Sequence, residues 1–359
     1  MTTTAVAARG RHRSRTASVD AVVVTIEADR RRVRRRAIGV GVTIAVALLA
    51  GSGAEILVGG SADIAVGEIP AALVGHADGL SHFVIFETRL PRALTALLSG
   101  ALFGLAGVIY QRLISNVLAT PDIIGVSAGA SAGAVAVLVG IGLRGLALQL
   151  GAIVGASAAA LIIFALSWRR GSSTYRLVLV GIGIGACFSA VTSYLLTFAD
   201  GSISSRAMRW LIGSLSGADW DGVVVLAAAT VLGGAGALLL EPSLSTIQLG
   251  DDLAAALGTR VQVVRMAALL LGAVLAAIAT SITGPVAFVA LVSGPIAGRL
   301  LPRSGPLPAA AVGASVVVVA DLVAQTGPGI SPVPTGVITG LIGAPVLMVL
   351  LINQKADTR

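Results

Sequence analysis

The stretch that decides the fold is residues 266–298, MAALLLGAVLAAIATSITGPVAFVALVSGPIAG, which contains no charged side chain. The same absence of charge extends over 93–111, 123–143, 145–168 and 177–199. The hydrocarbon core of a bilayer is about 30 Å thick and needs about 20 apolar residues per crossing helix. These stretches therefore predict an all-α, polytopic membrane protein.

Composition agrees with this prediction, because hydrophobic residues make up 56% of the chain and charged residues only 12%, unlike a soluble domain. Windowing the sequence predicts about ten transmembrane helices within a domain spanning 37–353. The expected spans are 37–58, 93–112, 123–142, 145–167, 177–199, 222–240, 264–282, 286–301, 307–326 and 333–352.

The two ends of the chain are expected on the cytoplasmic side of the membrane. Residues 1–36 hold ten arginines, and clusters of arginine beside a span stay on the cytoplasmic side. An even number of spans then places the C-terminal residues 354–359 on the same side. We interpret 1–36 as a disordered cytoplasmic tail and 354–359 as a short cytoplasmic one.

Several kinds of chemistry lack the residues that they need. Lys355 is the sole lysine and follows no glycine-rich loop, which argues against a phosphate-binding loop. The spacing of His12, His76 and His82 fits no metal-ligand template. The single cysteine, Cys187, allows no disulfide within the chain. We therefore expect no enzyme activity, no cofactor and no metal site.

One ionisable residue lies well inside a predicted span. Asp321 falls within 307–326, and a charge within the membrane often belongs to a transport pathway or a proton relay. Glu55 lies near the end of another span. A single interior aspartate supports an ion-coupled secondary transporter only weakly, so an uphill transporter of this composition would draw its energy from another chain. A structural role for Asp321, satisfied by backbone or by a neighbouring helix, remains the simpler reading.

Glycines recur four positions apart in several spans, a spacing that lets helix backbones approach closely in a membrane. The pattern predicts a compact helical bundle. The pairs are Gly100 and Gly104, Gly129 and Gly133, Gly151 and Gly155, Gly294 and Gly298, and Gly336 and Gly340.

Several segments resemble, in order, the permease subunits of ABC importers for iron-siderophores, haem and cobalamin, the FecCD-type family. They cover roughly residues 85–352. The segments are RLPR at 89–92, Gln111 with NVLATPDIIGVSAGA at 116–130, WLIGSL at 210–215, LGDDLA at 249–254 with Leu257 and Gly258, GPVAFVAL at 284–291, PTGV at 334–337 and GAP at 343–345.

This resemblance implies a type II (BtuC-like) permease fold in the plasma (cytoplasmic) membrane. It also implies a complex of two permease copies or paralogues with two cytosolic ABC ATPase subunits, served by an extracytoplasmic substrate-binding protein. A ferric siderophore is the substrate expected from most of the family, with cobalamin or haem as alternatives. ATP hydrolysis would belong to the partner subunits.

The resemblance also implies roles for particular residues. Arg89 and Arg92 would dock the binding protein, a role in which fixed cations pair with carboxylates; anchoring of lipid phosphates is the alternative. A cytoplasmic coupling loop at about 243–260 would contact the ATPase, and a cytoplasmic gate would restrict the pathway. The expected coupling residues are Gly250, Asp251, Asp252, Leu253, Ala254, Leu257 and Gly258, and the expected gate residues are Asn116, Leu118, Ser173 and Thr174.

The chain departs from the family pattern in three places. Val117 and Thr120 stand where relatives often have proline and aspartate, which predicts a less rigid turn. The segment 293–299 lacks a histidine that many relatives carry. The residues before Pro334 lack the charged group often found there, which puts a third ionic contact to the binding protein in doubt.

Overall fold

The computed structural model describes residues 46–55, 79–142, 145–167, 174–301, 305–327 and 333–357, together with positions 39, 41, 43 and 57. Within these residues all regular elements are helices, which confirms the all-α prediction. The predicted tail 1–36 lies outside the described residues. The predicted boundary at 353 falls inside a helix, because the last element continues to Asp357.

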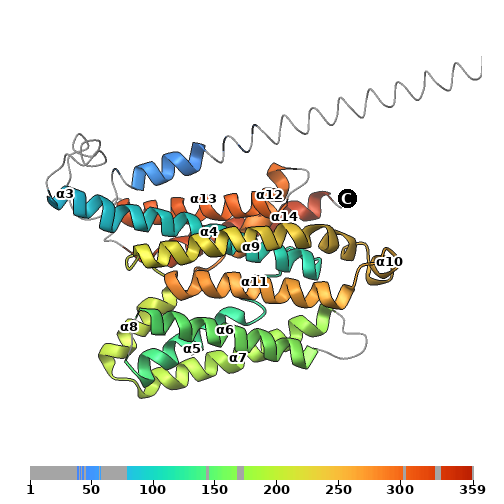
Figure 1. The fold of residues 1–359 in the computed structure, drawn as a ribbon, viewed down its shortest axis with the longest axis horizontal. Coiled ribbons are helices and arrows are strands. Elements are labelled where there is room, and N and C mark those ends of the chain that lie inside the picture. Colours follow the sequence, from blue (N-terminus) through green and yellow to red (C-terminus); the bar gives the residue numbers. More distant parts are fainter. Residues whose placement is uncertain are drawn as a thin grey trace, which may run out of the picture.

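Figure 1 labels the main helices from α3 to α14. In chain order the elements are α3 (Gly79–Phe83), the π-helix η1 (Val84–Arg89), α4 (Leu90–Ile114), α5 (Val126–Gly140), α6 (Leu146–Ser167), α7 (Thr174–Phe198), α8 (Gly201–Ile212), α9 (Trp220–Ile247), α10 (Asp251–Ala256), α11 (Val261–Thr283), α12 (Val289–Leu300), α13 (Pro306–Thr326) and α14 (Thr335–Asp357).

In the described parts of the chain, an apolar helix overlaps each of the ten predicted spans. Six are long and apolar enough to cross a membrane, and four shorter apolar helices accompany them. The shorter ones are Val46–Glu55, Val126–Gly140, Val289–Leu300 and Thr335–Val349. A short helix still crosses part of the bilayer when neighbouring helices cover its irregular ends.

The first long helix begins earlier than the predicted span at 93. α3, η1 and α4 form one continuous helical path, Leu80–Ile114. Pro91 sits in the first turn of α4, directly after the π-helical turn. A proline cannot donate to the preceding turn, and a widened turn of this kind accommodates that missing bond. The helix therefore extends past the apolar stretch without breaking at the proline.

α4 forms the centre of one part of the bundle, where it packs against α9, α11, α12 and α13. In its apolar window 83% of the residues are buried, against 11% in α7. α5, α6 and α7 pack on one another in a second group, which α11 joins to the first through contacts with α6 and α4. α7 thus leaves most of its surface at the periphery (Figure 1).

The glycine spacing predicted a compact bundle, and the contact between α5 and α6 confirms it. α5 and α6 meet through the two glycine pairs, since a Cβ built on Gly133 would lie 2.1 Å from the carbonyl oxygen of Gly151. A Cβ on Gly155 would lie 2.1 Å from the carbonyl oxygen of Gly129. No side chain larger than hydrogen fits at such a crossing, so these glycines set the distance between the helices.

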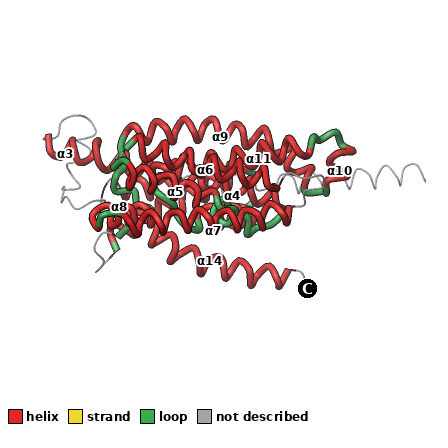
Figure 2. The backbone as a smooth tube through the Cα atoms, turned by 90° about the horizontal axis from the view of Figure 1, so that it is seen from below, coloured by secondary structure: helices red, strands yellow, loops and turns green. Residues whose placement is uncertain are grey.

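Short helices lie at the two opposite ends of the bundle (Figures 1 and 2). α8 lies at one end beside the start of α9, and α10 projects beyond the bundle at the other. These are called the α8 end and the α10 end below. α14 diverges from the bundle toward the α10 end (Figure 2), and a groove separates it from α12. The groove is lined by Ile296, Arg299, Leu300, Pro345, Val346 and Val349.

α9 continues past the predicted end of its span. The expected span ended at 240 and the coupling loop began at 243, whereas the helix continues to Ile247. Pro242 lies inside the helix, where its fixed φ is compatible with helical geometry. The hydroxyls of Ser245 and Thr246 donate back to the carbonyls of Glu241 and Pro242. The non-helical part of the loop is therefore shorter than expected.

Candidate functional site

Arg92 and Asp321 form a two-point ion pair at the α8 end. The Nε of Arg92 donates to Oδ2 of Asp321 at 2.8 Å, and its Nη2 donates to Oδ1 at 3.0 Å. The Asp321 side chain is 0% exposed and that of Arg92 is 20% exposed. The parallel geometry is the strongest arrangement available to an arginine and a carboxylate. The predicted docking cation and the predicted intramembrane aspartate are thus one structural unit.

Further donors fill the remaining capacity of the Asp321 carboxylate. The hydroxyl of Thr335, the first residue of α14, donates to Oδ1, and Nε2 of Gln325 donates to Oδ2 at 2.6 Å. Four hydrogen bonds therefore converge on one carboxylate. Asp321 joins α4, α13 and α14, which agrees with the simpler prediction that a neighbouring helix satisfies it.

Arg89, the second predicted docking residue, is turned into the protein. It is 5% exposed, and its Nη1 donates to the carbonyl oxygen of Leu57 at 3.2 Å. Arg89 and Arg92 are three positions apart and so lie on one helix face. Both guanidinium groups hold neighbouring helices, and their role in docking a binding protein stays a prediction.

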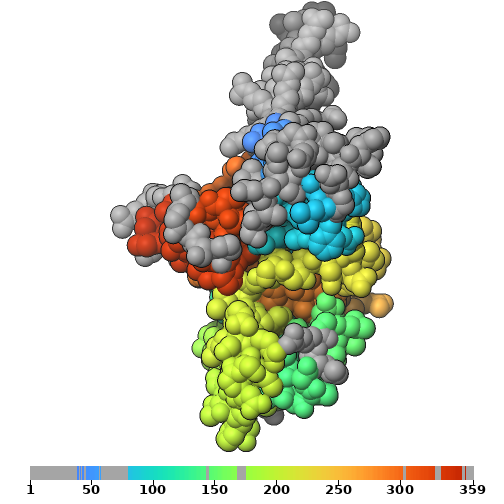
Figure 3. Space-filling model, turned by 90° about the vertical axis from the view of Figure 1, so that its left-hand side faces the viewer, coloured from blue at the N-terminus to red at the C-terminus, as the bar shows by residue number. Residues whose placement is uncertain are grey.

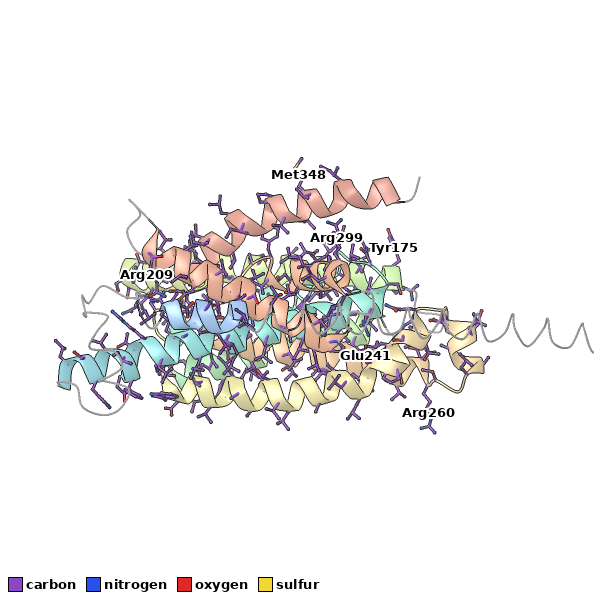
Figure 4. The ribbon with its side chains drawn as sticks, turned by 90° about the horizontal axis from the view of Figure 1, so that it is seen from above. Tyr175, Arg209, Glu241, Arg260, Arg299 and Met348 are labelled. Carbon is purple, nitrogen blue, oxygen red and sulfur yellow. The ribbon has the colours of Figure 1, made fainter. Side chains whose placement is uncertain are left out.

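The α7–α8 region forms part of the surface of the α8 end, where its yellow-green atoms occupy the lower part of Figure 3. α8 carries Arg206 and Arg209, and Arg209 is exposed. Figure 4 shows Arg209 at this end of the bundle. Trp220 adds a polar contact across the same end, because its Nε1 donates to the carbonyl oxygen of Phe86 at 3.0 Å.

The predicted gate residues Asn116 and Leu118 lie in a tight turn after α4. Ser115 adopts a left-handed conformation that ends the helix. The side-chain oxygen of Asn116 accepts from the backbone N–H of Leu118 at 2.9 Å. An asparagine that accepts a bond two residues on stabilises such a turn locally. The turn is thus ordered, although Val117 replaces the proline that relatives often have.

Gln111 connects this turn to α12. Its buried Nε2 donates to the carbonyl oxygens of Val117 and Leu291, both at 2.9 Å. A Cβ on Gly294 would lie 1.9 Å from Oε1 of Gln111, so a glycine at 294 leaves room for the amide. In the sequence Gln111 is recognisable only as part of a motif, because nothing there indicates which carbonyls a buried amide will reach.

The other two predicted gate residues are only partly covered. Ser173 lies outside the described residues, and Thr174 is the first residue of α7.

A further contact, which was not predicted, lies near the α10 end. Nη1 of Arg112 on α4 lies 3.1 Å from Oε1 of Glu241 on α9. The pair joins two helices whose ends approach α10, so it belongs to the same end of the bundle as the turn.

The predicted coupling segment contains a short helix at the tip of the α10 end. Gly250 precedes α10 with φ 107°, and Gly258 follows it with φ 85°. These are conformations that glycine adopts at little cost. Ala254 is fully buried, whereas Leu253 and Leu257 are 59% and 67% exposed. The helix thus presents a pair of leucines away from its own bundle.

The two aspartates of α10 differ in their contacts. Oδ1 of Asp251 accepts from Nη2 of Arg265 on α11 at 2.9 Å, which ties α10 to the following long helix. Asp252 is exposed. Both carboxylates sit in the first turn, where the helix dipole favours negative charge. Figure 4 shows Arg260, which follows α10, pointing away from the bundle.

Among the described residues no group of three metal-ligating side chains comes together. The described residues form instead two distinct ends joined by long helices. One end carries a buried ionic cluster, and the other carries a projecting helix with apolar side chains. Such a layout is suited to passing a displacement between two sides of a membrane.

Comparisons with known proteins agree with this architecture. The ferric enterobactin transport system permease protein of Escherichia coli (strain K12) is 37% identical over 298 residues, which cover 82% of this chain and 90% of the relative. The achromobactin transport system permease protein of Dickeya dadantii (strain 3937) is 38% identical, over 76% of this chain and 79% of the relative.

A solved structure described as an inward-facing metal-chelate type ABC transporter superposes with a TM-score of 0.76 at 26% identity. The match covers 87% of this chain and 98% of that one. A sequence profile of the FecCD transport family matches residues 43–353, which include the α4–α14 bundle and the projecting α10 helix. With its sequence motifs, its helix order and its overall shape all in agreement, this chain belongs to the FecCD transport family.

Proposed function

We propose that this chain is the transmembrane permease subunit of an ABC importer that moves a ferric siderophore into the cytoplasm. The observation that carries the proposal is α10, a short helix that projects beyond the bundle and exposes Leu253 and Leu257. An apolar pair at the tip of a charged loop fits a protein partner. The chain has no phosphate-binding loop of its own, so a separate ATPase is the partner that this surface fits.

The route by which ATPase closure would act on the pathway follows from side-chain contacts between the helices. α10 is tied to α11 through Asp251 and Arg265. α9 is tied to α4 through Glu241 and Arg112. Gln111, one position before Arg112, holds the turn of Asn116 and Leu118. A displacement of α10 would therefore be transmitted through α9 and α4 to the turn of the predicted gate.

A second permease copy or paralogue would complete the pathway against α7. This helix is little buried within its own chain, yet many of its exposed residues are small rather than bulky. Lipid-facing helices have no need of small residues, whereas helix–helix contacts and wide pathways use them. The exposed small residues are Gly183, Ala186, Cys187, Ser189, Ala190 and Ser193.

The binding protein would dock at the α8 end, on the extracytoplasmic side. The chain offers fixed cations there, but Arg92 is bound to Asp321 and Arg89 is buried. Docking through these two arginines therefore requires that the carboxylates of a partner compete with the internal pair. Exposed Arg209 is a cation that needs no such rearrangement.

The substrate proposal rests on the named relatives, which are permeases for ferric enterobactin and achromobactin. Cobalamin or haem remains the alternative. Uptake of a labelled ferric siderophore by cells that carry this permease as their sole route, with unlabelled cobalamin and haem as competitors, separates them. Failure of these cells to take up the labelled ferric siderophore, while they take up labelled cobalamin or haem, would overturn the siderophore assignment.

The importer proposal is tested by purifying the tagged full-length chain in mild detergent and identifying copurifying proteins by mass spectrometry. We expect a cytosolic P-loop ATPase, and a second permease sequence if the complex is a heterodimer. If the chain alone moves substrate into ATP-free vesicles, it is a secondary transporter, and neutralising Asp321 should then abolish transport.

The coupling assignment has its own test. Replacing Asp251 and Asp252 with arginine should leave the protein inserted but separate ATP hydrolysis from uptake. The matched control is Arg260→Gln, which changes an exposed charge of the same loop. Unchanged uptake in the aspartate variant would remove the coupling role from α10.

A further inference from the structure

Glu55 is a buried carboxylate that the transport proposal does not use. It lies in the helix described over 46–55 and is 2% exposed. Neither of its oxygens has a hydrogen-bond partner, and no ion pair among the described residues includes it. A buried ionised carboxylate without a partner is strongly disfavoured in a protein interior. The position therefore needs either a counter-charge or a bound proton.

The charges around Glu55 do not supply a free partner. Within electrostatic range lie Arg92 of α4 and Asp321 of α13. Arg92 already donates to both oxygens of Asp321. Arg89 approaches the same segment but donates to the carbonyl oxygen of Leu57. Thr335 of α14 and Gln325 direct their donors to Asp321. The cluster thus places two carboxylates beside a single bidentate guanidinium.

Other ligands fit this position less well than a proton. A metal ion would compete with the fixed positive charge of Arg92, and no group of three ligating side chains is found in the described parts of the chain. A docked partner cannot reach a side chain that is 2% exposed. A proton needs neither space nor further ligands.

We propose that Glu55 is a proton-binding site whose occupancy holds the 46–55 helix against α4 and α13 at the α8 end. Loss of the proton leaves two negative carboxylates beside Arg92. Glu55 must then compete with Asp321 for the guanidinium or leave the interface with its helix. Either outcome loosens the connection between the first helix and the bundle. The proposal does not depend on the transported substrate or on the ATPase.

An engineered disulfide can report this contact directly. A Cβ built on Gly51 would lie 4.0 Å from Cβ of Val318 on α13, within the about 3.5–4.5 Å range of disulfides. Cysteines at 51 and 318, in a Cys187→Ala background, should therefore form a disulfide when the helix is docked. The pair lies one turn from Glu55 and Asp321 and removes no group of the ionic cluster.

The experiment compares the rate of disulfide formation in membranes with Glu55 and with Glu55→Gln, across a series of pH values. Glutamine has the shape of the protonated acid, so it keeps the helix docked at every pH. We expect equal rates at low pH. At high pH the glutamate form should fall behind by about tenfold per pH unit once its proton is lost. The ratio of rates cancels the greater reactivity of thiols at high pH.

Glu87→Gln is the matched control, because Glu87 is exposed on η1 near the same end. It should follow the wild-type pH profile. A ratio between the Glu55→Gln and Glu55 rates that does not change with pH would overturn the proposal. So would release of the helix in both forms at the same pH. Recovery of equal amounts of each variant in the membrane excludes a folding defect as the cause.

Discussion

Arg92 of α4 donates two hydrogen bonds to the carboxylate of Asp321 of α13, although 229 positions separate the two residues in the chain. The pair crosses between two helices that also approach through glycines, since a Cβ on Gly100 would lie 2.5 Å from the carbonyl oxygen of Gly313. The contact between α4 and α13 is therefore fixed at two places, by closely packed backbones and by a buried ion pair.

Removing the charge of Asp321 should destabilise this contact. In Asp321→Ala, Arg92 keeps its charge and loses both acceptors, which should cost about 2–3 kcal/mol, less than for a fully buried pair because Arg92 is partly exposed. The measurement is thermal unfolding of the detergent-purified protein.

The double variant Arg92→Met with Asp321→Leu is the control for that experiment. It removes both charges together and should recover most of the lost stability, because no unpaired charge remains. If the losses of stability of Arg92→Met and of Asp321→Leu, each measured alone, add up to that of the double variant, the pair is energetically uncoupled.

Gly133→Ala should separate α5 from α6. The new methyl group would overlap the carbonyl oxygen of Gly151, so one helix must shift, at a cost of about 1–3 kcal/mol. Gly234→Ala in α9 is the matched control, since a Cβ there meets nothing within 4 Å and alanine favours the helix. Equal melting temperatures for the two variants would contradict the assigned packing.

Gln111→Leu should loosen the turn that holds Asn116 and Leu118. The substitution leaves the carbonyl oxygens of Val117 and Leu291 without their donor, which should cost about 1–3 kcal/mol. Under the proposed function, it should also increase ATP-independent leakage of substrate through the permease in vesicles. Gln325→Leu, which removes an amide donor at the opposite end, serves as the control for leakage. If leakage through Gln111→Leu does not increase, Gln111 has no role in closing the gate.

Leu253→Asp should weaken the association of the permease with its ATPase. The substitution removes the burial of a leucine, worth about 1.5–3 kcal/mol. It also places a charge in an apolar contact, where that charge must be desolvated. We expect at least a tenfold loss of ATP-driven uptake with normal insertion. Leu253→Met, which keeps an apolar side chain, should retain uptake. Full activity in Leu253→Asp would place the ATPase contact elsewhere on the chain.

The number and position of the membrane helices could be predicted from the sequence because each depends on local composition. A charge-free stretch such as 266–298 has the same meaning wherever it lies in the fold, since the bilayer acts as its solvent. Helix ends were less predictable. α9, for example, continues through Pro242 to Ile247, past the predicted end of its span at 240.

The roles of individual side chains were less predictable, because each depends on a partner distant in sequence. Arg92 and Asp321 were predicted to act separately, one as a docking cation and the other as an intramembrane polar residue. The structure joins them. Glu55 was noted only for its position near a span end, and its lack of a partner is a property of the packed bundle.

The sequence by itself determined that this chain is a bundle of about ten membrane helices, since apolar length, glycine spacing and family motifs can each be recognised in a short stretch of sequence. Only the tertiary structure decided which charges neutralise one another. An ion pair within a membrane forms between whichever groups the helices bring within about 3 Å of each other. That distance is set by helix packing, here by glycine contacts that place Arg92 against Asp321 and leave Glu55 buried beside them.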